Sequence, residues 1–391
     1  MKLLMYGAGS IGRGFIGPLF SFAGYEVVFV DIDAGLVKLL NSERSYYQKI
    51  MADPPYQRKV ENVRAIHSAA VESVLSEIVS CDIMAVSVGA APLALAAPTI
   101  ARGLLLREKR GGSVLNILLC ENMPDAAMRL RGWLSQSFHC GASPPPCGLV
   151  ETVVGRMVPA APVDAKRPES LSLAVEEYAF LPIDQDAFLG EIPKLPGLIP
   201  VSPFSFYIER KLYLHNMAHS CCAYLGMLFG IETVADAIHD PNIYRIVQAA
   251  MVESASMLEK RHGVPFESVF RHAESLLYRF ENRALGDVCA RGGRDPLRKL
   301  QADERFAGAL RRCREEGINA AHIACGLAAA LRTMTDDPMK ARNILVETCA
   351  LEENLVELVM GLWGALAGEK GHALLFHMIQ REKVKAGEGF V

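Results

Sequence analysis

The chain has 391 residues, which is long for a single core, so we expect two domains. Hydrophobic residues make up 51% of the chain and charged residues 22%, a balance typical of a soluble globular protein rather than a disordered one. The net charge is only −3, which argues against a large basic surface for nucleic acid.

Membrane and secretory signals are absent from the sequence pattern. The most apolar region, Leu212–Ile231, contains His215, Asn216 and His219, so we expect a buried helix rather than a membrane span. Met1 leads directly into an apolar strand, which predicts no signal peptide. Ten cysteines at irregular spacings, with no C-x-x-C pair, are typical of free thiols in a reducing cytosol. We therefore expect a cytoplasmic protein.

The first part of the chain alternates short apolar runs with helical segments. Strands are predicted at Lys2–Tyr6, Glu26–Asp31, Asp82–Val88 and Ser113–Cys120, and helices at Ser10–Ala23, Ala34–Asn41 and Pro92–Leu106. This order implies right-handed crossovers and a parallel sheet. A loop is predicted at Cys140–Pro146, and further strands at Leu149–Met157 and Leu171–Phe180.

The second half reads as helical. Four prolines in Pro193–Pro203 mark the crossing to it. Helices are predicted at Pro203–Gly230, Val234–His239, Ile243–Arg261, Phe266–Arg279, Glu304–Glu316, Ala320–Arg332 and Glu352–Leu366. We therefore predict the α/β class, with a Rossmann-type doubly wound domain over residues 1–195 and a mostly α-helical domain for catalysis and substrate over residues 196–391.

A glycine-rich turn follows the first predicted strand and opens the first predicted helix. It reads Gly7-Ala8-Gly9-Ser10-Ile11-Gly12. The first glycine permits a tight turn, the second lets a pyrophosphate approach the backbone, and the third lets helix and strand pack closely. Asp31 ends the second strand, where a carboxylate accepts from a ribose 2′-hydroxyl and repels a 2′-phosphate. These features predict NAD as the cofactor rather than NADP.

Arg13 extends the glycine signature toward Gly14. Two interpretations of its guanidinium are equally supported by the sequence: it lies against the cofactor phosphates, or it is a surface charge.

Three polar side chains share a broad face of the apolar helix that contains Leu212–Ile231. Lys211 and His219 are eight residues apart, about two turns, and Asn216 is three residues before His219. Polar groups in such a setting need partners or a ligand.

This spacing, Lys211-x4-Asn216-x2-His219, resembles the active-site motif of the polyol-specific long-chain dehydrogenases. Further blocks carry the same resemblance in the same order: Gly7–Gly17, Cys120–Met123, Glu209–Leu212, Arg279–Asn282 and Arg294–Leu300. Within that family the chain is most similar to the branch that acts on mannitol 1-phosphate. The resemblance extends to about Asp337 and is poor over the last fifty residues.

The resemblance implies roles for five residues. Lys211 would be the general base in polyol oxidation and the acid in ketose reduction, with a pKa lowered by desolvation and by positive charge nearby. Asn122 and Asn216 would donate hydrogen bonds to the developing alkoxide. His219 would orient Lys211 or a substrate hydroxyl, and Glu121 would link the base to solvent. NAD would take the hydride.

His215 and His219 are four residues apart, a spacing that zinc sites use. Asn216 stands where H-E-x-x-H would place its glutamate, and no third ligand is evident. The family that the chain resembles needs no metal, so we expect none.

A phosphate site is indicated by a basic segment, in which Arg294, Arg298 and Lys299 are the candidates and Arg291 and Arg305 lie nearby. Together with the resemblance it favours a polyol phosphate and its ketose phosphate, mannitol 1-phosphate and fructose 6-phosphate being the first pair to test. Two residues depart from the family pattern: Gly155, where we expect aspartate, and His215, where we expect an apolar residue.

Two alternatives remain open from the sequence. The substrate could be an unphosphorylated polyol or a sugar acid, in which case the three basic residues would be inert. The chain could also be an inactive NAD(H)-binding regulatory protein, which would bind NADH without turnover. The combination of one lysine, two asparagines and one histidine argues against the second alternative.

Overall fold

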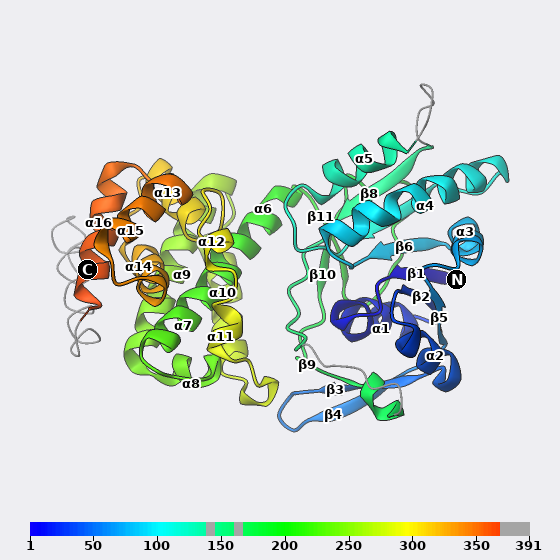
Figure 1. Ribbon diagram of the computed structural model, residues 1–391, viewed down its shortest axis with the longest axis horizontal. Helices are drawn as coiled ribbons and strands as arrows, with labels where there is room; N and C mark the ends of the chain where they lie inside the picture. Colours follow the sequence, from blue (N-terminus) through cyan, green and yellow to red (C-terminus); the bar gives the residue numbers. More distant parts are fainter. Residues whose placement is uncertain (138–144, 160–166, 368–391) are drawn as a thin grey trace. The chain divides into compact units, whose positions relative to one another are not determined.

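The computed structural model describes residues 1–137, 145–159 and 167–367 (Figure 1). It divides the chain into two units, Met1–Ser205 and Phe206–Val391. The boundary between the two units lies after Ser205, whereas the sequence pattern predicted it after residue 195.

A parallel sheet of six strands forms the centre of the first unit. Its spatial order is β5-β2-β1-β6-β7-β8, and the strands are β1 (Lys2–Tyr6), β2 (Glu26–Asp31), β5 (Val63–His67), β6 (Ile83–Val86), β7 (Leu115–Leu119) and β8 (Cys147–Glu151). The order reverses between β1 and β6, so the connections leave the sheet in opposite directions there. In such sheets ligands bind outside the carboxyl ends of the strands at this point.

Successive residues along each strand face opposite sides of the sheet, and both sides are buried in a hydrophobic core. In β1, Leu3 and Met5 enter one core, and Leu4 and Tyr6 enter the other. The first core contains residues of α1 (Gly17–Ser21) and α2 (Ala34–Glu43), and the second contains residues of α3 (Val71–Ser80), α4 (Ala90–Lys109) and α5 (Ala126–Gln136). A strand buried on both faces reads as a continuous apolar run, which is why the pattern was clear in the sequence.

Smaller sheets complete the first unit. An antiparallel hairpin of β3 (Tyr46–Ile50) and β4 (Tyr56–Val60) is extended by β9 (Leu173–Val175), and β10 (Leu181–Asp184) pairs in parallel with β11 (Leu198–Val201). The sequence pattern did not predict this hairpin, and the strands predicted at Leu149–Met157 and Leu171–Phe180 were too long. Residues 140–144 of the predicted loop lie outside the described residues.

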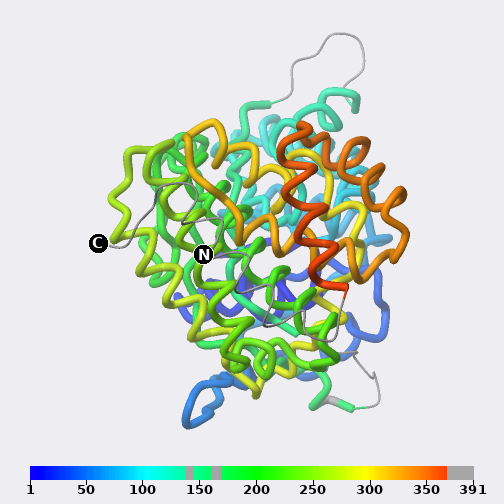
Figure 2. The backbone as a smooth tube through the Cα atoms, turned by 90° about the vertical axis from the view of Figure 1, so that its left-hand side faces the viewer, coloured from blue at the N-terminus to red at the C-terminus, as the bar shows by residue number. Residues whose placement is uncertain are grey.

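The second unit is helical, green to red in Figure 2, and its described residues 206–367 contain no β-strand. Its helices are α6 (Phe204–Glu209), α7 (Met217–Leu228), α8 (Val234–His239), α9 (Pro241–His262), α10 (Phe266–Phe280), α11 (Cys289–Gly292), α12 (Pro296–Lys299), α13 (Ala307–Glu315), α14 (Ala321–Met334), α15 (Pro338–Asn343) and α16 (Glu353–Ala365).

Small residues let the two central helices of this unit, α7 and α14, approach closely. A Cβ added at Gly326 of α14 would lie 2.8 Å from the Cys221 Sγ of α7. Most residues of both helices are buried, because each helix is surrounded by other helices. The predicted fold class is confirmed: a parallel-sheet unit precedes a helical one. Among the described helices, none combines the length and apolar character needed to cross a bilayer.

Candidate active site

The glycine-rich turn leaves β1 at the point where the strand order reverses. Gly7 has a φ of +102°, and a Cβ there would lie 2.3 Å from the Ser87 carbonyl oxygen. A Cβ at Gly12 would lie 2.1 Å from the Gly7 carbonyl oxygen. Protein packing therefore requires glycine at both positions.

Gly9 is different, because a Cβ at this position would meet no described atom within 4 Å. Its backbone also lies outside the left-handed region. Neither strain nor packing explains this glycine, whereas a ligand lying against the turn would. Ser10 and Ile11 follow it at the start of the helix, both half-buried. This open cradle at a helix N-terminus fits the pyrophosphate of a dinucleotide.

Asp31 lies across the turn at the end of β2. Its Oδ2 accepts from the Ala8 N–H at 2.7 Å, and its Oδ1 accepts from the Asp33 N–H at 3.0 Å. The carboxylate is half-buried and held in place by these donors. Each oxygen keeps a further lone pair, which fits a ribose hydroxyl.

Arg13 points into the protein. Its side chain is 2% exposed, its Nε donates to the Ala8 carbonyl at 2.6 Å, and its Nη1 donates to the Leu171 carbonyl at 2.6 Å. The surface-charge interpretation is therefore wrong. Burial lowers the pKa of Arg13, and Tyr46 and Asp31 oppose that lowering. The buried guanidinium therefore supports the glycine-rich turn through its bond to the Ala8 carbonyl.

The helix after the turn is π-helical over Gly12–Ile16, so the Gly17 N–H reaches back to the Gly12 carbonyl. Other side chains bond the carbonyls within this stretch. Tyr46 Oη donates to the Arg13 carbonyl at 2.7 Å, and Gln48 Nε2 donates to the Gly14 carbonyl at 2.7 Å. Inward-facing residues of β3 therefore support the helix that follows the glycine-rich turn, which we call the nucleotide helix.

Glu121 and Asn122 follow β7 at the carboxyl edge of the sheet. The Glu121 carboxylate accepts from the Val88 N–H at 2.7 Å and from the Gly89 N–H at 3.0 and 3.1 Å. These donors directly precede the long helix α4, whose positive end favours a carboxylate. Asn122 is exposed beside it. Glu121 thus ties the loop after β6 to the loop that carries Asn122.

A π-helical stretch, Arg210–Asn216, brings the lysine motif of the second unit into line. The Met217 N–H reaches back to the Leu212 carbonyl. In i→i+5 geometry Asn216 follows Lys211 by one turn, and His219 follows Asn216 by one turn of α7. All three positions then fall on one narrow face, whereas α-helical counting places them on a broad one. Ser254 Oγ donates to the Tyr213 carbonyl at 2.7 Å and supports this stretch.

His219 is oriented by a partner that sequence reasoning missed. Its Nε2 lies 2.8 Å from Asp287 Oδ2, and Arg291 donates to Asp287 Oδ1 at 2.8 and 3.0 Å. Burial alone would raise the pKa of Asp287, but His219 and Arg291 together hold it below its ordinary value. An ionised carboxylate only accepts, so the His219 Nε2 carries a proton and donates a hydrogen bond to Asp287.

His215 lies among basic side chains. Burial lowers its pKa well below the ordinary value, and Arg279, His272, His219 and Lys211 lower it further. The ring is therefore neutral at neutral pH. Its centroid is 6.1 Å from that of Phe280. Within the described residues, no group of three or more His, Cys, Asp or Glu side chains could hold a metal ion.

The three basic candidates for phosphate differ in exposure. Arg294 and Arg298 are exposed, and Arg298 pairs with Glu304 at 3.1 Å. Lys299 is buried and donates to the Gly292 carbonyl. Burial, with Arg305 and Arg298 nearby, lowers the pKa of Lys299 to about 8. The structure therefore brings Arg298 and Lys299 together near Arg305.

Two family models match almost the whole chain. A mannitol dehydrogenase Rossmann domain matches residues 1–197, and a mannitol dehydrogenase C-terminal domain matches residues 204–363. The chain belongs to the mannitol dehydrogenase family.

Two solved structures have the same fold. A D-sorbitol dehydrogenase in substrate-free form is 17% identical, with a TM-score of 0.77, over 95% of this chain and 94% of its own. A Pseudomonas fluorescens mannitol 2-dehydrogenase, in a ternary complex with NAD and D-mannitol, is 15% identical, with a TM-score of 0.77, over 97% of this chain and 94% of its own. This family membership confirms the predicted resemblance at family level.

Proposed function

We propose that this member of the mannitol dehydrogenase family is an NAD-dependent enzyme that interconverts a polyol phosphate and a ketose phosphate, with mannitol 1-phosphate and fructose 6-phosphate as the best pair. The observation that carries the reaction class is the π-helical stretch Arg210–Asn216, whose i→i+5 geometry supports a common face for Lys211, Asn216 and His219. The open cradle at Gly9 and the fixed carboxylate of Asp31 support NAD.

The proposed chemistry starts with a proton. Lys211 takes it from the hydroxyl that becomes the carbonyl, or returns it when the ketose is reduced. Asn216 is proposed to donate a hydrogen bond to the developing alkoxide, and Asn122 is proposed as a further donor. Bound NAD supplies the hydride acceptor.

His219 is proposed to position the lysine or the substrate. Its Nδ1 can accept from the Lys211 ammonium or from a substrate hydroxyl, because Asp287 fixes the ring through Nε2. Glu121 is better suited to a positioning role than to a proton relay, since main-chain donors already hold both of its oxygens.

Substitution of Lys211 tests the reaction class. A Lys211→Ala protein should lose turnover by at least about 100-fold while NADH binding, measured by fluorescence titration, is unchanged. Lys194→Ala provides a lysine control in the other unit. Turnover of Lys211→Ala at the wild-type rate would refute the mechanism.

Phosphate recognition rests on the basic cluster around Arg298 and Lys299. The assay is loss of NADH absorbance with fructose 6-phosphate, compared with fructose. Turnover with the phosphate alone is expected. Arg294→Gln and Arg298→Gln should raise KM for fructose 6-phosphate, and the exposed Arg271→Gln should not.

An unphosphorylated polyol is the second candidate, because one similar structure is named for sorbitol and the other holds D-mannitol. Faster turnover of fructose than of fructose 6-phosphate would support it. NADH binding without turnover of any ketose would instead support an inactive regulatory protein.

A further inference from the structure

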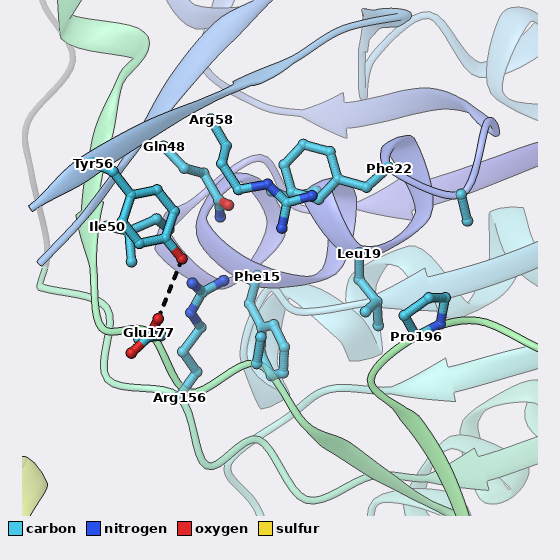
Figure 3. A pocket seen from close by; sticks show the side chains of 13 residues that line it. Phe15, Leu19, Phe22, Gln48, Ile50, Tyr56, Arg58, Arg156, Glu177 and Pro196 are labelled. Atoms are coloured by element: carbon cyan, nitrogen blue, oxygen red, sulfur yellow. Dashed lines mark hydrogen bonds between the residues drawn. The ribbon is translucent and has the colours of Figure 1, made fainter. Parts of the chain in front are cut away.

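A cavity of about 180 Å³ lies within the first unit, behind the nucleotide helix (Figure 3). One wall is apolar and comes from the helix that follows the glycine turn, with Phe15, Leu19 and Phe22. The opposite wall comes from the β3–β4 hairpin and from the segment after β8. It carries arginine side chains at positions 58 and 156.

Arg156 is built into this cavity. Its side chain is 7% exposed. Its Nε and Nη2 donate to the Glu176 carbonyl at 2.9 and 2.7 Å, and its Nη1 donates to the Gly14 carbonyl at 3.2 Å. A guanidinium has five N–H donors. Within the described residues these bonds use three, which leaves two for a ligand.

Arg58 provides a second positive charge. Its guanidinium lies 3.7 Å from the centroid of the Phe22 ring, and no carboxylate among the described residues pairs with it. In Figure 3 the guanidinium groups of Arg58 and Arg156 both point toward the middle of the lining residues. Two guanidinium groups, each with several N–H donors, therefore line the cavity opposite its apolar wall.

The two charges affect each other. Burial lowers the pKa of Arg156 to about 10, Glu176 and Tyr56 oppose this, and Arg58 lowers it further. The acid in the lining is Glu177, whose Oε1 lies 3.5 Å from the Tyr56 hydroxyl. An anion between the arginines would relieve their repulsion and form charge-assisted hydrogen bonds.

We propose that this cavity is a binding site for a small organic anion that combines one carboxylate or phosphate with an apolar body. Arg58 and Arg156 bind the anionic group, and Phe15, Leu19 and Phe22 contact the apolar part. A cavity of about 150 Å³ can hold benzene. The space here therefore suits a single ring or a branched chain of similar size.

The site is distinct from the dinucleotide cradle. The apolar wall of the cavity is formed by residues from Phe15 to Phe22, toward the end of the helix, whereas Gly9 lies before the helix begins. Two lining residues of the cavity, Arg156 and Gln48, donate to the Gly14 carbonyl, which lies two residues after the glycine-rich turn.

Benzoate is the probe, and its uptake by the full chain is measured by isothermal titration calorimetry in buffer free of other organic anions. Saturable binding is expected. Arg58→Gln should weaken it at least ten-fold, because Arg58 is exposed and its loss removes a charge without disturbing the fold. Benzyl alcohol, which has the same ring without the charge, should bind at least ten-fold more weakly.

The control variant is Arg102→Gln, an exposed arginine on α4 that pairs with Glu72. It should bind benzoate as the wild type does, and both variants should keep the wild-type melting temperature. Absence of saturable benzoate binding would overturn the proposal. Equal affinity of Arg58→Gln and wild type would do the same. The test uses no turnover, so it is independent of the proposed enzyme activity.

Discussion

The Gly9→Ala substitution distinguishes the effect of this position on stability from its effect on NADH affinity. A Cβ at this position meets no described atom within 4 Å, and the backbone is not left-handed. The substitution should therefore leave stability unchanged or raise it by roughly 0.4–1 kcal/mol, because alanine restricts the unfolded chain. The new methyl group would occupy the space where we propose that the pyrophosphate lies, so NADH affinity should fall at least ten-fold, or about 1.4 kcal/mol.

The assay is a fluorescence titration with NADH beside a thermal melt. Gly12→Ala is the contrasting variant. Its Cβ would lie 2.1 Å from the Gly7 carbonyl, so it should destabilise the protein by about 1–3 kcal/mol. Gly132→Ala is the control for NADH affinity, since its Cβ also meets nothing within 4 Å but lies on α5. If Gly9→Ala bound NADH as tightly as Gly132→Ala, the reasoning about the cradle would be refuted.

Three further predictions concern the helical unit. Asp287→Asn replaces the carboxylate that fixes His219 by a neutral amide, which can donate as well as accept, so kcat should fall roughly 10- to 100-fold and its pH profile should shift, while unchanged kinetics would exclude a positioning role. Ser254→Ala deprives the Tyr213 carbonyl of its donor and should cost about 1–3 kcal/mol in urea denaturation, against almost nothing for the exposed Ser135→Ala. Burial, with Arg210 and Arg279 nearby, lowers the pKa of His272 from 6.5 to about 3, so only the unfolded chain binds its proton between these values. Stability should fall below pH 6.5 by up to about 1.4 kcal/mol per unit more than in His272→Gln, and parallel pH curves would contradict this.

Local patterns in the sequence were sufficient for the parallel sheet, the glycine turn and Asp31. Each of these depends on residues close together in the chain: an apolar run, a turn, and a carboxylate at the end of a strand. The same holds for the lysine motif, which occupies nine residues. The family could therefore be predicted from the amino-acid sequence alone.

Interaction partners that are far apart in the chain could not be predicted from these local patterns. Asp287 lies 68 residues from His219, and no spacing rule joins them. Arg13 is buried because the Leu171 carbonyl, 158 residues away, accepts from it. The β3–β4 hairpin was missed because Gln48 faces inward, where the alternating pattern demands an apolar residue.

The π-helical stretches could not be predicted for a related reason, since an extra residue in a turn leaves the hydrophobic composition unchanged. Both Gly12–Ile16 and Arg210–Asn216 have carbonyls that accept from side chains of other elements: Tyr46, Gln48 and Arg156 in the first, Ser254 in the second. The supporting donors make the irregular turns stable, and the turns set the positions of the functional groups. For Lys211 the consequence is direct, because i→i+5 geometry brings its position closer to the face of Asn216 and His219 than α-helical geometry would. A donor such as Ser254 therefore acts on the proposed chemistry through the backbone, without contact with any substrate.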